Sequence, residues 1–453
     1  MIPYYYSIVA LGVVYVLVRS GINRLSLFVV LIFWEGLFGF LGVINIYKIM
    51  VFAYALVILS QNKWTQSYKD KYINLFFLLF SIFFWISYLL YGGNLITILS
   101  QYGFKYGMVF LIYHGFKEFF SSAQRREYFK RLLLRVLTIQ IILSVIKIII
   151  IGFPVETNVG SITYGAGGTA VVIPIIGLIF YWVINNNGNF RIKNWLYVSS
   201  LLIVAIASGK RSPMILFPLC IAILFISGHE KFKISRVIKY LPIAITLSFI
   251  LFYFGLRLLP SLNPDQKVWG RFDPQYTLDY VLIYNFGTDE LGKIEQAEEG
   301  RGASLFLLFK PNELNLKNII EILFGKGIYK TATKSSGRFL GGRAYGIDHQ
   351  GLLGTFIYVI YSLGYAGFLS MLCFSLALLN SIKQNNIKYI LIGFYVYEFF
   401  LYANQVVFSN ASAVLVVFVC HYCGMFVNSS PDFKFDKVKI EPHENIVYPP
   451  CNS

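Results

Sequence analysis

The chain has 453 residues, of which 57% are hydrophobic, 18% are aromatic and only 13% are charged. Soluble globular domains carry about 25% charged residues. The mean hydropathy of +0.63 is therefore too high for one soluble core, and the composition excludes collagen-like, disulfide-scaffold and disordered chains. The net charge of +17 does not by itself indicate nucleic-acid binding, because membrane proteins hold excess Lys and Arg in cytoplasmic loops. The sequence predicts an all-α polytopic membrane protein.

Apolar segments of about 20 residues are long enough to cross a bilayer as helices. In chain order, the candidate spans are 3–19, 25–43, 46–61, 72–91, 96–116, 132–152, 168–186, 195–208, 212–228, 239–258, 350–380, 387–404 and 409–427. A very short hinge joins the second and third of them, so we expect twelve or thirteen transmembrane helices. The segment 350–380 is longer than one span requires, and Gly364 and Gly367 predict a break or a tilt within it.

Lys and Arg are shared unequally between alternate loops. The loops on one side, together with the C-terminal tail, hold 22 of them, whereas the short loops on the other side hold only Lys48, Lys210 and Arg211. By the positive-inside rule the rich side is cytoplasmic. The N-terminus is then expected outside and the C-terminus inside, and the basic charge requires no nucleic-acid partner.

One long connection, from Leu259 to Asp348, is placed outside by this alternation. A structureless loop of this length is unusual, so we expect a folded cap that carries function. Apolar residues at the i, i+3, i+4, i+7 positions from Leu316 to Leu323 predict an amphipathic helix, and Gly325 is placed to end it. The predicted organisation is transmembrane helices over 1–258, the cap over 259–348, C-terminal transmembrane helices over 349–428 and a cytoplasmic tail over 429–453.

A short basic turn, Ala207–Ser212, lies between two apolar runs and contains Lys210 and Arg211. Positive charge is otherwise avoided on the outer side, and guanidinium groups match phosphate in shape. The turn therefore predicts an anion site. Because the spaced upstream glycine and a Ser or Thr directly after the Lys are missing, it is not a P-loop. The alternative is a tight turn whose cations contact lipid headgroups.

The cap returns to the membrane at Asp348 and His349. Histidine has an unperturbed pKa of about 6.5, so it is suited to accept a proton near neutral pH. Asp348 is a candidate for orienting the imidazole. The preceding residues 301–343 hold eight Lys and Arg against two Glu, which predicts a positive field next to His349. The alternative is a polar pair that anchors the start of the next helix.

Several charged side chains fall inside predicted spans, where they are expensive and often functional. Glu35, Lys105, Lys147 and Glu398 are of this kind, and Arg257 lies near an outer helix end. Each has a structural alternative, either an ion pair within the bundle or a long side chain that extends to the membrane surface.

The segment Cys420–Cys423, with His421 between its cysteines, has the spacing of half a metal site. No second Cys/His pair exists to complete tetrahedral zinc, so a packed helix is expected. Gly325 and Gly327 flank a lysine after the amphipathic helix, and they either allow the backbone to approach a phosphate or end the helix.

Three segments resemble the O-antigen ligase and polymerase superfamily. They are the turn Ala207–Ser212, Gly300–Arg301 with the helix that leads to Gly325–Gly327, and Asp348–Gly354 with Gly364–Gly367. The order of spans and the large outer loop late in the chain are also similar to that superfamily. The resemblance implies a GT-C-type glycosyltransferase fold in the bacterial inner membrane.

Members of this superfamily act at the outer face of the membrane on undecaprenyl-diphosphate-linked oligosaccharides, without a nucleotide sugar, a metal or another cofactor. The resemblance implies that Arg211 and Arg301 bind the diphosphate and that His349 occupies the position of the catalytic histidine. Gln350 stands where ligases usually carry Asn. Expected partners are the lipid-linked oligosaccharide and membrane lipids, with a chain-length regulator and a flippase as candidate protein partners.

The expected function is therefore polymerisation of O-antigen or capsule repeat units. His349 and Asp348 are the candidate catalytic residues. The candidate substrate-binding residues are basic side chains of the turn and the cap, namely Lys210, Arg211, Arg257, Arg301, Arg338 and Arg343. An O-antigen ligase uses the same chemistry with another acceptor and remains an alternative. A lipid-linked oligosaccharide transporter is a third possibility, although transporters usually show internal repeats and none is visible here.

Overall fold

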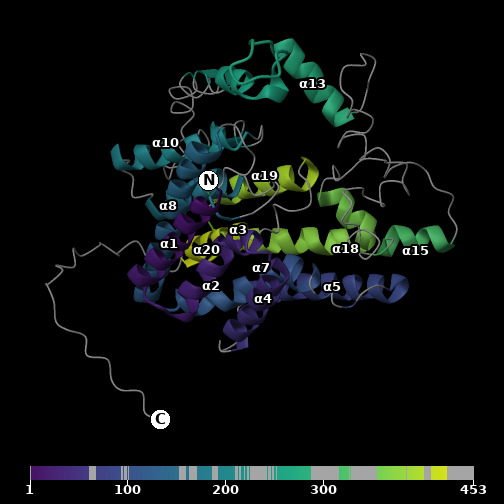
Figure 1. Ribbon diagram of the computed structural model, residues 1–453. Coiled ribbons are helices and arrows are strands. Elements are labelled where there is room, and N and C mark those ends of the chain that lie inside the picture. The colour runs from purple at the N-terminus through teal and green to yellow at the C-terminus, as the bar shows by residue number, and fades with distance from the viewer. Residues whose placement is uncertain are drawn as a thin grey trace, which may run out of the picture.

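The computed structural model describes eleven stretches of the chain and some shorter pieces between them. The stretches are 2–60, 68–92, 101–152, 160–162, 171–185, 192–209, 252–286, 316–325, 355–383, 385–401 and 410–425; the pieces are 95, 99, 213, 216–218, 220, 221, 224, 242, 246, 249, 250 and 327. Every regular element in them is a helix (Figure 1), as the sequence predicts.

The N-terminal half contains helices of very different lengths. In chain order its elements are α1 (Ile2–Ser20), α2 (Arg24–Phe33), α3 (Glu35–Phe40), α4 (Ile44–Ser60), α5 (Tyr68–Tyr91), the π-helix η1 (Gln101–Gly107), α7 (Met108–Phe116), the 3-10 helix η2 (Lys117–Phe120), α8 (Ala123–Ile151), the π-helix η4 (Val172–Ile176), α9 (Gly177–Asn185) and α10 (Ile192–Ala207).

The C-terminal half begins with the part of the predicted cap that the structure describes. Its elements are the 3-10 helix η5 (Pro260–Leu262), α13 (Pro274–Phe286), α15 (Leu316–Phe324), α18 (Thr355–Asn380), α19 (Asn385–Leu401) and α20 (Asn410–Met425). Helix α15 covers the segment that the apolar spacing predicts, and Gly325 ends it with a φ of 74°. This part of the sequence prediction is confirmed.

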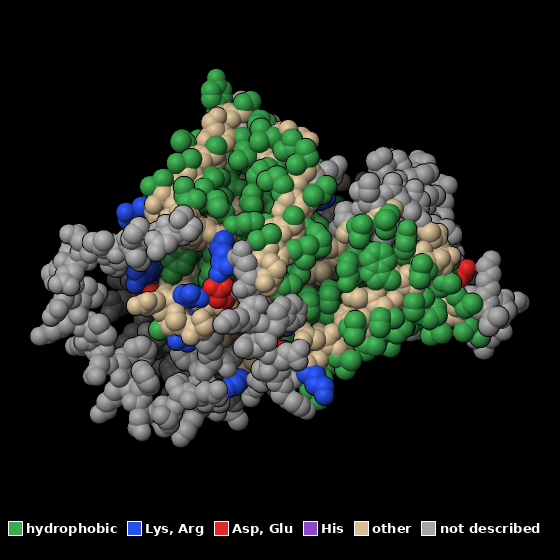
Figure 2. Space-filling model, turned by 90° about the horizontal axis from the view of Figure 1, so that it is seen from below, with side chains coloured by type: hydrophobic (Ala, Val, Ile, Leu, Met, Phe, Trp, Pro, Cys, Tyr) green, Lys and Arg blue, Asp and Glu red, His purple; other side chains and the backbone are tan. Residues whose placement is uncertain are grey.

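Four of the described helices are long and apolar enough to cross a membrane. They contain the segments Pro3–Ser20, Asp70–Tyr91, Ala123–Ile150 and Ser362–Asn380, and six shorter apolar helices accompany them. Many of their large hydrophobic side chains are exposed, and hydrophobic side chains cover much of the described part of the face in Figure 2. These features agree with an α-helical membrane protein, whereas the total of twelve or thirteen spans stays a prediction.

Two predicted spans are interrupted. The segment 25–43 forms two helices, α2 and α3, because the chain leaves helical geometry at Trp34, with a φ of −113° and a ψ of 25°. A single continuous helix was therefore the wrong expectation there. Within α18, Gly364 has a φ of 71° and a ψ of −177°, so the predicted break is present at that glycine.

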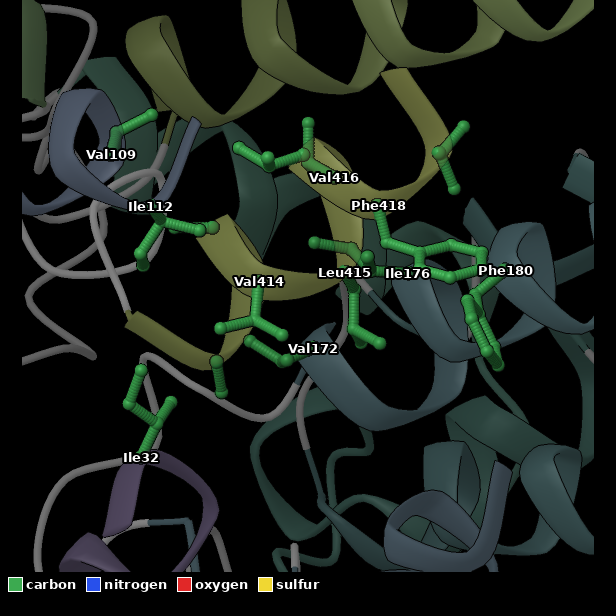
Figure 3. Close-up of a cluster of buried hydrophobic side chains, with 14 of the residues drawn as sticks. Ile32, Val109, Ile112, Val172, Ile176, Phe180, Val414, Leu415, Val416 and Phe418 are labelled. Atoms are coloured by element: carbon green, nitrogen blue, oxygen red, sulfur yellow. The ribbon is translucent and has the colours of Figure 1, made fainter. Parts of the chain in front are cut away.

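Helix α20 lies in the centre of the hydrophobic core. Figure 3 shows its residues Val414–Phe418 surrounded by side chains from α2, α7, η4 and α9. Residues 410–420 are all buried. The imidazole of His421 is 2.8 Å from the carbonyl oxygen of Tyr113 and stacks on the Tyr113 ring. The Cys420–Cys423 segment is thus part of a packed helix.

Helices α1 and α8 are joined near the C-terminus of α1. The guanidinium of Arg135 donates hydrogen bonds to the carbonyl oxygen of Arg19, at 2.8 Å, and to the hydroxyl of Ser20, at 2.9 Å. The hydroxyl of Tyr128 donates to the carbonyl oxygen of Ser20 at 2.9 Å. These bonds occupy carbonyl groups that the end of a helix otherwise leaves without a partner.

Candidate functional site

The basic turn predicted as an anion site begins where α10 ends. The hydroxyl of Ser208 donates to the carbonyl oxygen of Ala205 at 2.7 Å, and Gly209 has a φ of 64°. A glycine in this conformation directly after a helix is a common helix terminator. The chain therefore turns immediately before Lys210 and Arg211, which lie outside the described residues.

A small separate hydrophobic core joins this end of α10 to the first part of the predicted cap. Leu256, Leu259 and Leu262 are buried in it, and Ile206 of α10 packs against them together with Phe272 and Tyr280. Figure 1 shows α13 on the side of the molecule where α10 lies, apart from the main bundle. The contact places the end of α10, where the basic turn begins, beside the segment that contains Arg257.

Asn263 organises the loop that follows this core. Its amide nitrogen donates to the carbonyl oxygens of Leu259, at 2.8 Å, and Lys267, at 2.9 Å. A Cβ atom on Gly270 would collide with the Asn263 side chain, so only glycine fits beside it. A buried amide with several backbone partners holds the loop in one conformation.

Arg257 is fixed by this loop. Its Nε donates to the carbonyl oxygen of Gly270 at 3.1 Å, and its Nη1 is 3.0 Å from the hydroxyl of Tyr253. The guanidinium also lies over the rings of Tyr253, at 5.7 Å, and Trp269, at 5.4 Å. In the described part of the chain, its Nη2 group makes no hydrogen bond. The Nε and Nη1 groups of Arg257 are thus held in place by this loop and by Tyr253.

Trp269 has an unusual backbone conformation beside Arg257. Its φ is 62° and its side chain is 52% exposed. A bulky residue in this region of the Ramachandran plot costs on the order of 1–3 kcal/mol, and such residues occur often at ligand-binding sites. An exposed indole next to a fixed guanidinium can stack on a sugar while the arginine contacts a phosphate. We call Tyr253, Arg257 and Trp269 the arginine–aromatic cluster.

A second arrangement brings the end of α15, at Gly325, into contact with the break in α18, at Gly364. A Cβ atom on Gly325 would lie 2.5 Å from the backbone nitrogen of Leu363, and one on Gly364 would overlap the carbonyl oxygen of Leu323. The end of α15 therefore contacts the break in α18 backbone to backbone. We call this contact, with the residues that bond to it, the helix-break contact.

Hydrogen bonds to Ser362 complete the helix-break contact. The hydroxyl of Ser87, on α5, donates to the carbonyl oxygen of Ser362 at 3.0 Å, and the backbone nitrogen of Gly327 donates to the same oxygen at 3.2 Å. A break in a helix at membrane depth is tolerated where neighbouring groups bond its released backbone. Gly325 ends α15, which is the structural alternative given for it, and both glycines also allow close approach of the backbone.

A third polar cluster surrounds the interruption between α2 and α3, and the sequence analysis did not find it. The amide of Gln140 donates to the carbonyl oxygen of Phe33 at 3.1 Å and to the hydroxyl of Ser161 at 2.9 Å, and it accepts from the Ser161 backbone nitrogen at 2.7 Å. Residues 160–162, which we call the inserted segment, are buried here. The sequence feature that could have indicated this cluster is Gln140, a polar residue within the apolar part of α8.

The inserted segment is held from several sides. The backbone nitrogen of Gly36 donates to the carbonyl oxygen of Ser161 at 2.8 Å, and the hydroxyl of Tyr5 donates to that of Gly160 at 2.9 Å. Lys147 is only 3% exposed and lies over the Tyr5 ring. Lys147 therefore packs inside the bundle instead of extending to its surface.

The other predicted site residues lie outside the described residues. They are Lys210, Arg211, Arg301, Arg338, Arg343, Asp348 and His349, and the side chains of Lys105 and Glu398 are likewise not described. The described structure consequently places one predicted site residue, Arg257, and the backbone that leads to Lys210. No family model, curated protein or solved structure matches the chain.

Proposed function

We propose that this protein is a polysaccharide polymerase, a metal-independent glycosyltransferase of the GT-C type that joins undecaprenyl-diphosphate-linked repeat units at the outer face of the bacterial inner membrane. The observation that carries the proposal is the packing of the end of α10 against the segment of Arg257. This contact places the end of α10, directly before Lys210 and Arg211, beside the segment that contains Arg257, and it supports the proposal that these basic side chains act at one site. An O-antigen ligase would use the same site with a different acceptor.

The proposed reaction begins with the acceptor hydroxyl. His349 removes its proton, and the oxygen attacks the anomeric carbon of the donor sugar. The bond between that carbon and the diphosphate oxygen breaks, and its electron pair leaves with the undecaprenyl diphosphate. Arg211 and Arg301, with Lys210, Arg257, Arg338 and Arg343 nearby, stabilise the charge on this leaving group. Because the diphosphate leaves readily, positioning and electrostatics supply most of the catalysis.

Replacement of the proposed base tests the chemistry. We expect His349→Ala to lower the polymerisation rate about 10²–10⁴-fold, because a positioned general base contributes this much, while binding of the lipid-linked donor is retained. The assay uses the purified full-length protein with a synthetic lipid-diphosphate oligosaccharide and measures turnover and donor affinity separately.

The matched control is His229→Ala, which changes a histidine in a predicted cytoplasmic loop and should leave the rate unchanged. Arg211→Lys and Arg301→Lys should weaken donor binding, because an ammonium group cannot form the bidentate phosphate contact of a guanidinium. Normal turnover by His349→Ala would assign the base to another residue, and the absence of turnover by the wild-type protein would contradict the proposed function.

The orientation of the cap is a separate prediction. We expect single cysteines in place of Asp289 and Lys334, in a protein without its natural cysteines, to react with a membrane-impermeant thiol reagent in intact cells. A cysteine in place of Gln124, in a predicted cytoplasmic segment, should react only after lysis. The opposite pattern would place the cap inside and remove the site from the outer face.

A transporter of lipid-linked oligosaccharides is the second candidate, and the interrupted helices favour it. Transporters often bind substrates where helices are broken near the middle of the membrane. The breaks at Trp34, beside the inserted segment, and at Gly364 are the two interruptions that support this candidate. Proteoliposomes separate the candidates, since a polymerase lengthens the glycan on one face and a transporter moves it across unchanged.

A further inference from the structure

A groove with a volume of about 630 Å³ lies between α5, α18 and α19, and its lining residues belong neither to the arginine–aromatic cluster nor to the helix-break contact. Volumes of about 300–1,000 Å³ are typical of ligand sites. Its lining residues are Tyr72, Phe76, Cys373, Leu376, Ala377, Asn380, Ser381, Lys388 and Ile392. We call it the α5–α18–α19 groove.

The wall of this groove has an apolar part and a polar part. Phe76, Cys373 and Leu376 supply apolar surface on α5 and α18. Polar side chains gather where α18 ends and α19 begins, at Asn380 and Lys388. A membrane lipid has the same division, with an acyl chain at one end and a polar headgroup at the other.

Lys388 gives the polar part a positive charge. Its ammonium group donates a hydrogen bond to the side-chain oxygen of Asn380, which is neutral. Within the described ranges no carboxylate forms an ion pair with Lys388, whereas Lys117 and Lys130 pair with Asp70 and Glu127. A cation without a carboxylate partner beside an apolar groove is complementary to an anionic amphiphile.

The surroundings of the groove are suited to contact with lipid. Tyr72 on α5, Leu376 on α18 and Tyr389 on α19 are all exposed. Both α5 and α18 contain segments long and apolar enough to cross a membrane. The positive-inside rule assigns the end of α18 to the cytoplasmic side, where anionic lipids attract basic side chains.

We propose that the α5–α18–α19 groove binds an anionic phospholipid of the surrounding bilayer. One acyl chain lies along Phe76 and Leu376, and the phosphate contacts Lys388. The site is distinct from the proposed polymerase site and does not depend on it. A bound phospholipid would contact all three helices, so the packing of α18 against α5 and α19 would depend on the lipid composition of the membrane.

The test measures lipid binding to the delipidated full-length protein by native mass spectrometry. Phosphatidylglycerol should bind wild-type protein more tightly than phosphatidylcholine does. Lys388→Gln should weaken phosphatidylglycerol binding about fivefold, as expected for one basic residue at a lipid surface. Ala377→Trp, which fills the groove, should remove binding. The control Lys130→Gln changes a basic residue outside the groove and should bind like the wild type.

Cys373 offers a second measurement in the folded protein. It lines the groove and is partly exposed, whereas Cys220, Cys420 and Cys423 are buried. In a Cys451→Ser background, phosphatidylglycerol should slow the reaction of Cys373 with a maleimide, and phosphatidylcholine should not.

Three results would overturn the proposal. Lys388→Gln could bind phosphatidylglycerol with unchanged affinity, or both lipids could protect Cys373 equally, which would make the groove a general apolar surface. Alternatively, Ala377→Trp could change the oligomeric state and leave lipid binding intact, which would identify a second copy of the chain as the occupant.

Discussion

Gly364→Val is expected to lower the polymerisation rate about 10²-fold, the loss that follows from a misplacement of about 1 Å in an active site. Gly364 has a φ of 71° and a ψ of −177°, a region almost confined to glycine. A valine side chain would also overlap the carbonyl oxygen of Leu323. The substitution therefore separates α15 from α18, and with it the cap from the helix that follows His349. Polymer length in cells and turnover of the purified protein measure the effect.

The matched control is Gly393→Ala. Gly393 lies inside α19, and a Cβ atom there would meet nothing within 4 Å. Alanine is favoured over glycine in a helix by about 1 kcal/mol, so this variant should retain full activity. Limited proteolysis gives a separate readout, because release of α15 should expose residues 316–324 to cleavage in Gly364→Val. Normal turnover and protection in that variant would show that the helix-break contact is dispensable.

Gln140→Leu is expected to lower the free energy of unfolding by about 2–4 kcal/mol. The side chain of Gln140 is fully buried and bonds Phe33, the Ser161 hydroxyl and the Ser161 backbone nitrogen. Leucine fills a similar volume but leaves these groups with fewer partners, and each buried polar group without a partner costs about 1–3 kcal/mol. Unfolding of the purified protein in mixed detergent measures the change.

Gln275→Leu is the control for this variant. Gln275 lies on α13, where it is exposed, and among the described residues it bonds only the Asp279 side chain, at 3.3 Å. Surface substitutions of this kind usually change stability by less than about 0.5 kcal/mol. Equal stability of Gln140→Leu and Gln275→Leu would contradict the role given to Gln140 as the residue that holds the inserted segment.

The sequence predicts the helical class and several particular elements because hydropathy and helix-ending residues are local signals. The amphipathic segment at 316–324, the break at Gly364 and the turn after Ala207 are examples. The break at Trp34 escaped prediction, since it is stabilised by Gln140 and Ser161, which are more than 100 residues away. No local pattern reports such a contact.

The candidate site is predictable only in part, because it also depends on contacts that local sequence patterns do not encode. Arg257 was identified from its charge and its place at a helix end, but its neighbours Trp269 and Gly270 reach it through a loop. The conformation of this loop depends on the Asn263 side chain and on backbone angles that hydropathy does not encode. The arginine–aromatic cluster can therefore be identified only from the structure, whereas the basic turn can be identified from the sequence.

Hydrogen bonds connect α1 to α8 at two places along α1. Arg135 bonds the C-terminal end of α1, and Tyr5, near the N-terminal end of α1, is linked to Gln140 of α8 through the inserted segment. These connections restrain α1 against α8. If the protein binds a lipid-linked glycan as proposed, we expect the opening that admits it elsewhere, and the contact of α15 with α18 is the candidate. There the backbones at Gly325 and Gly364 meet directly, so a change of backbone angle at these two glycines would displace α15 as a hinge.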